Sequence, residues 1–148
     1  MLYFADCYIF IIFATKLDDY EHYCWKKNGN RRVGATLLQR SLGIEGVKTS
    51  ISAWVIKGDE TKAGGQVDLL IMRDDNIVNL CEMKFTSTPY SVDKEEEAKM
   101  LYRVDLLKES LSARQRPHLT LITTYGLISG KHSGKVQKVV TCDDLFSK

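Results

Sequence analysis

The stretch that most constrains the fold of this chain is "GGQVDLLIMRDDNIVNLCEMKF", residues 64 to 85. Two apolar segments flank a short polar turn, a pattern that predicts a β-hairpin. Asp68, Glu82 and Lys84 nevertheless interrupt the apolar segments. An unpaired charge inside an apolar core costs several kcal/mol, so such charges indicate an exposed face, an ion pair or a functional site.

The alternation of side chains along the two strands predicts which face of the sheet each charged residue lies on. Successive side chains of a strand point to opposite sides, so Glu82 and Lys84 share one face of the second strand. On the first strand the expected faces are Asp68, Leu70 and Met72 on one side and Val67, Leu69 and Ile71 on the other. Both faces are mainly apolar, which is typical of central strands covered on both sides. We therefore expect the charges to be partly buried.

The length of the turn decides whether Asp68 meets Glu82. A three-residue turn over Asp74–Asn76 places the two carboxylates opposite each other, whereas a two-residue turn places Asp68 opposite Met83 and sends the carboxylates to different faces. The sequence Asp-Asp-Asn favours the three-residue turn, because Asn tolerates a positive φ better than most residues.

In that register the hairpin carries the groups of a phosphodiester hydrolysis site. Two carboxylates whose Cβ atoms lie about 5 Å apart repel each other. Mg²⁺ or Mn²⁺ relieves such repulsion and binds through one or two carboxylates plus waters. Lys84, on the same face, could orient or deprotonate a water, or hold the negative charge that develops on a phosphate.

The rest of the chain predicts an α/β fold. A helix over 35–44 ends at Gly43, and a helix over 91–111 starts with Asp93 and Glu96 at the spacing of a capping box. Further strands are expected over 47–56, 118–127 and 136–146. The order α-β-β-β-α-β-β, with a helix between the third and fourth strands, predicts a mixed β-sheet flanked by helices.

Composition narrows the class of protein. With 148 residues and a net charge of +2, the chain fits one domain over 35–148 preceded by an apolar or linker segment over 1–34. No Cys or His pair has zinc spacing. The apolar stretch over 7–14 follows no basic residue and is shorter than the roughly 18 residues of a membrane span. We expect a cytoplasmic protein without a membrane segment.

The hairpin resembles the PD-(D/E)XK nuclease superfamily, in which Asp on one strand precedes Glu-x-Lys on the next. Together with "LGIEGVKTSISAW" before it and "YSVDK" after it, the hairpin looks like the C-terminal nuclease-like domain of bacterial P-loop ATPases of the archaeal-ATPase type. The resemblance covers about residues 36 to 110. It implies a restriction-endonuclease-like sheet and a Mg²⁺-dependent endonuclease acting on DNA, with RNA as the alternative substrate.

By this resemblance, Asp68, Glu82 and the backbone carbonyl of Met83 would bind Mg²⁺ or Mn²⁺, and Lys84 would be the catalytic lysine. Gln66 would neighbour the site. The superfamily often has a glutamate on its first helix; "ATLLQRSLGI" contains no acid, and Glu21 is the nearest candidate.

The resemblance departs from the parent ATPases in one respect. The P-loop pattern G-x-x-x-x-G-K-[ST] is missing, since "SGKHSGKV" lacks the leading glycine and the final hydroxyl residue. We expect no ATP binding by this chain. The apolar start of segment 1–34 should pack as a helix or strand of this fold, and the alternative is that the segment is the stub of an upstream domain.

Other interpretations stay open. The charges could form an ion-pair network without a metal. The chain could be an inactive module of the same fold that binds nucleic acid or a protein partner, or a homodimerisation domain. Lys94, in the first turn of the long helix, is a weak site candidate.

Overall fold

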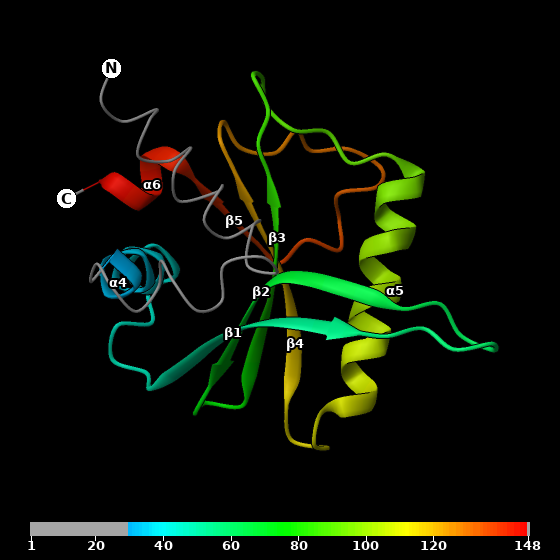
Figure 1. Cartoon of the computed structure of the whole chain (residues 1–148). Coiled ribbons are helices and arrows are strands. Elements are labelled where there is room, and N and C mark those ends of the chain that lie inside the picture. The colour runs from blue at the N-terminus through cyan, green and yellow to red at the C-terminus, as the bar shows by residue number, and fades with distance from the viewer. Residues whose placement is uncertain (1–29, 148) are drawn as a thin grey trace.

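The structure, a computed structural model, describes residues 30–147 (Figure 1). Its elements follow in the order α4 (Asn30–Leu42), β1 (Thr49–Ile56), β2 (Gly65–Arg73), β3 (Ile77–Lys84), α5 (Lys94–Ser110), β4 (Arg116–Thr123), β5 (Lys138–Thr141) and α6 (Cys142–Phe146). Residues 1–29, which include Glu21 and most of the predicted segment 1–34, lie outside the described residues. Among the described helices none is long and apolar enough to cross a membrane.

The strands form one five-stranded mixed sheet in the order β1-β2-β3-β4-β5. The pairs β1–β2 and β2–β3 are antiparallel, and the pairs β3–β4 and β4–β5 are parallel. Helix α5 makes the crossover from β3 to β4, as a parallel pair requires. The predicted α/β architecture with a mixed sheet flanked by helices is confirmed.

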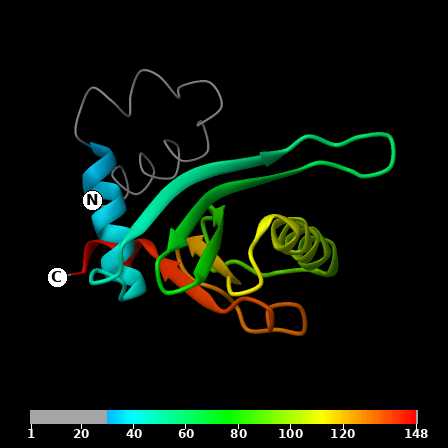
Figure 2. The same ribbon diagram turned by 90° about the horizontal axis from the view of Figure 1, so that it is seen from below.

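Helices cover both faces of the sheet (Figure 2). On one face α4 and α6 pack on a cluster that contains Leu38 and Leu145 with the strand residues Leu69, Ile71, Cys81, Met83, Ile122 and Val140. On the other face α5 packs on a cluster that contains Met100, Val104 and Leu107 with Val67, Leu70, Val78, Leu80, Leu119 and Leu121. The middle strand β3 is buried from Val78 to Met83, which confirms the central position expected for it.

The turn between β2 and β3 has three residues, as predicted. Asn76 has a φ of 66°, and its N–H donates to the carbonyl of Arg73 at 3.3 Å. The ladder pairs Met72 with Val78 and continues to Leu69 and Cys81. Counted on from this ladder, Asp68 and Glu82 are the next positions, where the two strands separate.

A β-bulge in β2 changes one expected face. Ser52 pairs with Leu70 but Trp54 pairs with Val67, so residue 53 of β1 opposes both Asp68 and Leu69. The extra residue turns Val67 to the α5 side, where it packs with Leu70. The prediction that Val67 shares a face with Leu69 is therefore wrong, because alternation of side chains stops at a bulge.

Helix α4 ends where the sequence predicts and starts earlier. Gly43 has a φ of 69°, its N–H donates to Arg40, and the N–H of Ile44 donates to Gln39, both at 2.9 Å. These two bonds form a Schellman motif, which satisfies the last carbonyls of a helix. The helix begins at Asn30, before the expected start at residue 35.

The last predicted strand, 136–146, is wrong in its second half. The strand β5 ends at Thr141, and residues Cys142–Phe146 form α6. The Thr141 side chain accepts from the N–H of Asp144, whose carboxylate accepts from the N–H of Thr141. This capping box starts a helix despite the β-branched residues before it. The strand expected over 118–127 likewise ends at Thr123.

Candidate functional site

The candidate site lies where β2 separates from β3. Their ladder ends at the pair Leu69 and Cys81, while β2 continues beside β1 to the pair Ile56 and Gly65. In an antiparallel ladder every second residue exchanges both backbone hydrogen bonds with the neighbouring strand. After Cys81, Met83 is the next residue of β3 that would bond to β2 in this way. Because β2 has left, the backbone N–H of Met83 has lost that partner.

The Asp68 side chain replaces the backbone acceptor that β2 would otherwise offer to Met83. Its Oδ2 accepts a hydrogen bond from the N–H of Met83 at 2.9 Å. The bulge at Asp68 and Leu69 is what turns this carboxylate toward β3, since bulges re-aim side chains and end pairing. The N–H and C=O of one strand residue face the same neighbour, so the Met83 carbonyl faces the same opening.

Glu82 is buried at the centre of the site, with 3% of its surface exposed. Its Oε2 accepts from Nη1 of Arg103 at 2.8 Å, and its Oε1 has no hydrogen-bond partner among the described residues. Burial raises the pKa of Glu82 to about 7; the Arg103 charge opposes the rise and the Asp68 charge adds to it. An unsatisfied buried carboxylate oxygen is costly and calls for a ligand or a proton.

Lys84 is held by two groups beyond the hairpin. Its Nζ lies 2.7 Å from Oε2 of Glu96, and the Tyr90 hydroxyl donates to the same oxygen at 3.2 Å. The ammonium also lies 5.7 Å from the centroid of the Tyr90 ring. Burial lowers the pKa of Lys84, but the hydrogen bond to Glu96 and the charges of Tyr90, Glu96 and Glu82 outweigh burial and leave that pKa raised.

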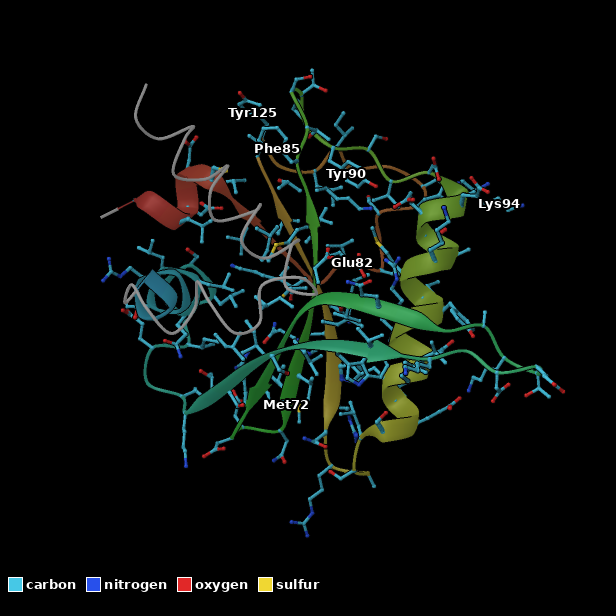
Figure 3. The ribbon with its side chains drawn as sticks, in the orientation of Figure 1. Met72, Glu82, Phe85, Tyr90, Lys94 and Tyr125 are labelled. Carbon is cyan, nitrogen blue, oxygen red and sulfur yellow. The ribbon has the colours of Figure 1, made fainter. Side chains whose placement is uncertain are left out.

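Helix α5 supplies the counter-charges, Arg103 for Glu82 and Glu96 for Lys84. Figure 3 shows Glu82 between the sheet and α5, with Tyr90 nearer the start of that helix. Asp93 caps the helix by accepting from the N–H of Glu96 at 2.9 Å. The expected capping box is only half formed, because the Glu96 carboxylate binds Lys84 and Tyr90.

Sequence reasoning missed both α5 residues, although a signal for them exists. Glu96 and Arg103 stand seven positions apart on the same stripe as the buried Met100 and Leu107. Two charges on the stripe that faces the sheet indicate partners in the sheet.

The structure brings together four of the predicted site residues: Asp68, Glu82, Met83 and Lys84. It does not bring in the weaker candidates that it describes. Gln66 is exposed beyond the bulge and pairs with Val55 of β1. Lys94, exposed at the first residue of α5, lies well away from Glu82 (Figure 3).

The oxygen atoms of the opening suit a small divalent cation with few protein ligands. Asp68 has no ion-pair partner in the described part of the chain, Oε1 of Glu82 is unsatisfied, and the Met83 carbonyl faces the same gap. Mg²⁺ usually takes one or two carboxylates and keeps several waters. Within residues 30–147 no group of three His, Cys, Asp or Glu side chains that could hold a metal ion is found, so a cation here would have at most two carboxylate ligands from the described residues.

Cys81 is no nucleophile here. It is fully buried, and burial, followed by the charges of Glu82 and Asp68, raises the pKa of its thiol. A neutral buried thiol is unreactive.

Comparison with known proteins finds one similar solved structure and no matching family. No protein-family model matches the chain, and no curated protein matches it. A crystal structure of a protein of unknown function, AF1548, is similar over 73% of this chain with 18% sequence identity and a TM-score of 0.47. This chain spans 55% of that chain's length. The likeness carries no inference about activity.

Proposed function

We propose that this chain hydrolyses DNA phosphodiesters in a Mg²⁺- or Mn²⁺-dependent reaction, on a restriction-endonuclease-like sheet. The observation that carries the proposal is the pair of carboxylates, Asp68 and Glu82, where β2 separates from β3. Oε1 of Glu82 has no partner among the described residues, and the Asp68 carboxylate, which accepts only a backbone N–H among the described groups, lies near enough for its charge to raise the pKa of Glu82. Two neighbouring carboxylates that share a single nearby guanidinium, Arg103 beside Glu82, favour a metal.

In the proposed reaction a water oxygen forms a bond to phosphorus while the bond from phosphorus to the leaving oxygen breaks. The leaving oxygen takes up a proton, and the water loses one. Asp68, Oε1 of Glu82 and the Met83 carbonyl would hold the cation. Bound there, it would supply Lewis acidity and lower the pKa of a water.

Lys84 suits the role of a cation better than that of a base. Its Glu96 partner favours the ammonium form, and that form accepts no proton. A fixed ammonium beside the scissile phosphate would stabilise the negative charge of the transition state.

A second function has one observation in its favour. Glu82 and Lys84 are both paired with side chains of α5, so the interior charges of the described residues are partly neutralised without a metal. An inactive module that binds nucleic acid or a protein partner through its surface would need only these ion pairs, and no metal, to balance its interior charges.

Cleavage of supercoiled plasmid by the purified chain, with Mg²⁺, with Mn²⁺ and with a chelator, tests the proposal. We expect metal-dependent nicking that Asp68→Asn, Glu82→Gln and Lys84→Met each reduce by more than the roughly 10- to 100-fold that loss of an outer-shell partner costs. Asp105→Asn changes an exposed carboxylate on α5 and serves as the control.

Two results would count against hydrolysis. Wild-type protein that leaves DNA intact with either metal contradicts it, as does cleavage by Asp68→Asn at the wild-type rate. DNA association that survives Glu82→Gln, without any cleavage by the wild type, would establish the second function.

A further inference from the structure

Both oxygens of the Glu96 carboxylate interact with side chains of the site or next to it. Its Oε2 accepts from Lys84 at 2.7 Å and from Tyr90 at 3.2 Å, and its Oε1 lies 3.5 Å from Nζ of Lys99. The side chains of Lys84 and Glu96 are 24% and 25% exposed. The α5 pair Lys108 and Asp105, by contrast, is 56% and 69% exposed.

The helix does not need this carboxylate for capping. Asp93 already satisfies the N–H of Glu96, and the glutamate of a capping box would bind back to the N–H of residue 93. Glu96 reaches across to the sheet instead. Its partner, Lys84, has a long side chain with many rotamers, and an ammonium defines no direction by itself. Fixing that ammonium requires an external group.

We propose that Glu96 is a positioning residue for the hydrolysis proposed above, and that with Tyr90 it holds the Lys84 ammonium on the face of β3 that carries Glu82. The inference rests on the proposed function. It adds α5 to the site as the element that fixes the lysine. The Tyr90 ring, 5.7 Å from Nζ, limits the ammonium from a second direction, and the Tyr90 hydroxyl fixes the Glu96 oxygen that Lys84 binds.

A purely structural ion pair makes a different prediction. It would stabilise α5 on the sheet, so breaking it by Glu96→Ala or by Lys84→Met would lower stability and activity together. A positioning role instead lowers kcat through Lys84 even under conditions where the variant is fully folded. Glu97 offers a matched control, because it is the next residue on α5 and its carboxylate lies 2.6 Å from Nδ1 of His132, away from Lys84.

Steady-state kinetics of metal-dependent DNA cleavage test the role. We expect Glu96→Ala to lower kcat by about 10- to 100-fold, with KM and Mn²⁺ affinity changed by less than about twofold, as for loss of an outer-shell partner. Glu96→Gln should recover part of kcat, since its amide oxygen still accepts from Lys84. In a Lys84→Met background, Glu96→Ala should cause no further loss. Glu97→Ala should keep the wild-type kcat.

The positioning is overturned if Glu96→Ala and Glu97→Ala lose the same kcat, or if Glu96→Ala is as harmful with methionine at position 84 as with lysine. A second measurement does not depend on activity. The ¹⁵Nζ resonance of Lys84 should show slow hydrogen exchange in the wild type and in Glu97→Ala, and fast exchange in Glu96→Ala. Equal exchange in all three overturns the positioning even if DNA is cut. A wild type that cuts nothing, with exchange as expected, overturns the proposed function and the catalytic part of this inference.

Discussion

Replacing Glu82 with glutamine should remove a large pH dependence from the stability of this protein. Glu82 is buried, and burial raises its pKa from 4.5 to about 7 against the opposing charge of Arg103. The folded protein therefore holds the Glu82 proton more tightly than the unfolded chain. Stability from this residue is present below pH 4.5 and is lost as the pH rises through about 7.

The size of the effect follows from the pKa. One pKa unit corresponds to about 1.4 kcal/mol, so the rise from 4.5 to about 7 corresponds to about 3 kcal/mol. The amide introduced by Glu82→Gln would resemble the protonated acid in shape and would not ionise. The variant and the wild type should have similar free energies of unfolding near pH 4.5, and the variant should be more stable by roughly 3 kcal/mol near pH 8.

Urea unfolding of both proteins between these two pH values, followed by circular dichroism, measures the difference. The m-values should stay equal, which shows that the same surface is exposed on unfolding. Other titrating groups occur in both proteins and cancel in the comparison. Parallel curves of unfolding free energy against pH would contradict a raised pKa, because they would mean that Glu82 ionises in the folded state as easily as in the unfolded chain.

Three further substitutions test the fold around the site. Asp93→Ala removes the side chain that caps α5 and should cost about 1 kcal/mol in urea unfolding; no loss would mean that the cap does not form. Gly43→Ala places a side chain at a φ of 69° with open space around it, so conformational strain alone should cost about 1 kcal/mol, and a neutral result would contradict the left-handed conformation. Leu121→Ala, at a fully buried position under α5, should cost about 2–5 kcal/mol, and a smaller loss than Ile128→Ala at an exposed position would contradict its placement in the core.

The hairpin shows how far local sequence determines the structure. Asn76 at the third position of the turn fixes the register, because it accepts the positive φ that a three-residue turn needs, and this register brings Asp68 and Glu82 to the end of the β2–β3 ladder. Burial of β3 on both faces follows from its apolar composition. These features depend on neighbours along the chain, and they could be predicted.

The features that could not be predicted depend on distant partners. The bulge at Asp68 arises from the pairing of β2 with β1, so no pattern within β2 reveals it. The bond from Met83 to Asp68 follows from that bulge. Glu96 looks like half of a capping box until Lys84 is placed beside it, and Arg103 looks like a solvated helix residue until Glu82 is found beneath it.

The C-terminal error has a local cause. "KVVT" is rich in β-branched residues, so extending the strand through Asp143 and Asp144 follows the composition of the preceding residues. The Thr141 and Asp144 capping box forms a helix there, because two side-chain to backbone bonds satisfy N–H groups that the sheet leaves unpaired. Threonine followed three positions later by an acid was the signal.

Calorimetric titration of the chain with Mn²⁺ and with Mg²⁺ measures whether the site where β2 separates from β3 binds a cation. We expect saturable binding that Asp68→Asn and Glu82→Gln each abolish and that Asp105→Asn leaves unchanged. Binding should release protons near neutral pH, because the pKa of Glu82 is about 7 and metal ligation requires the carboxylate. Absence of binding in the wild type, or binding that Asp68→Asn and Glu82→Gln leave intact, would contradict the proposed metal site.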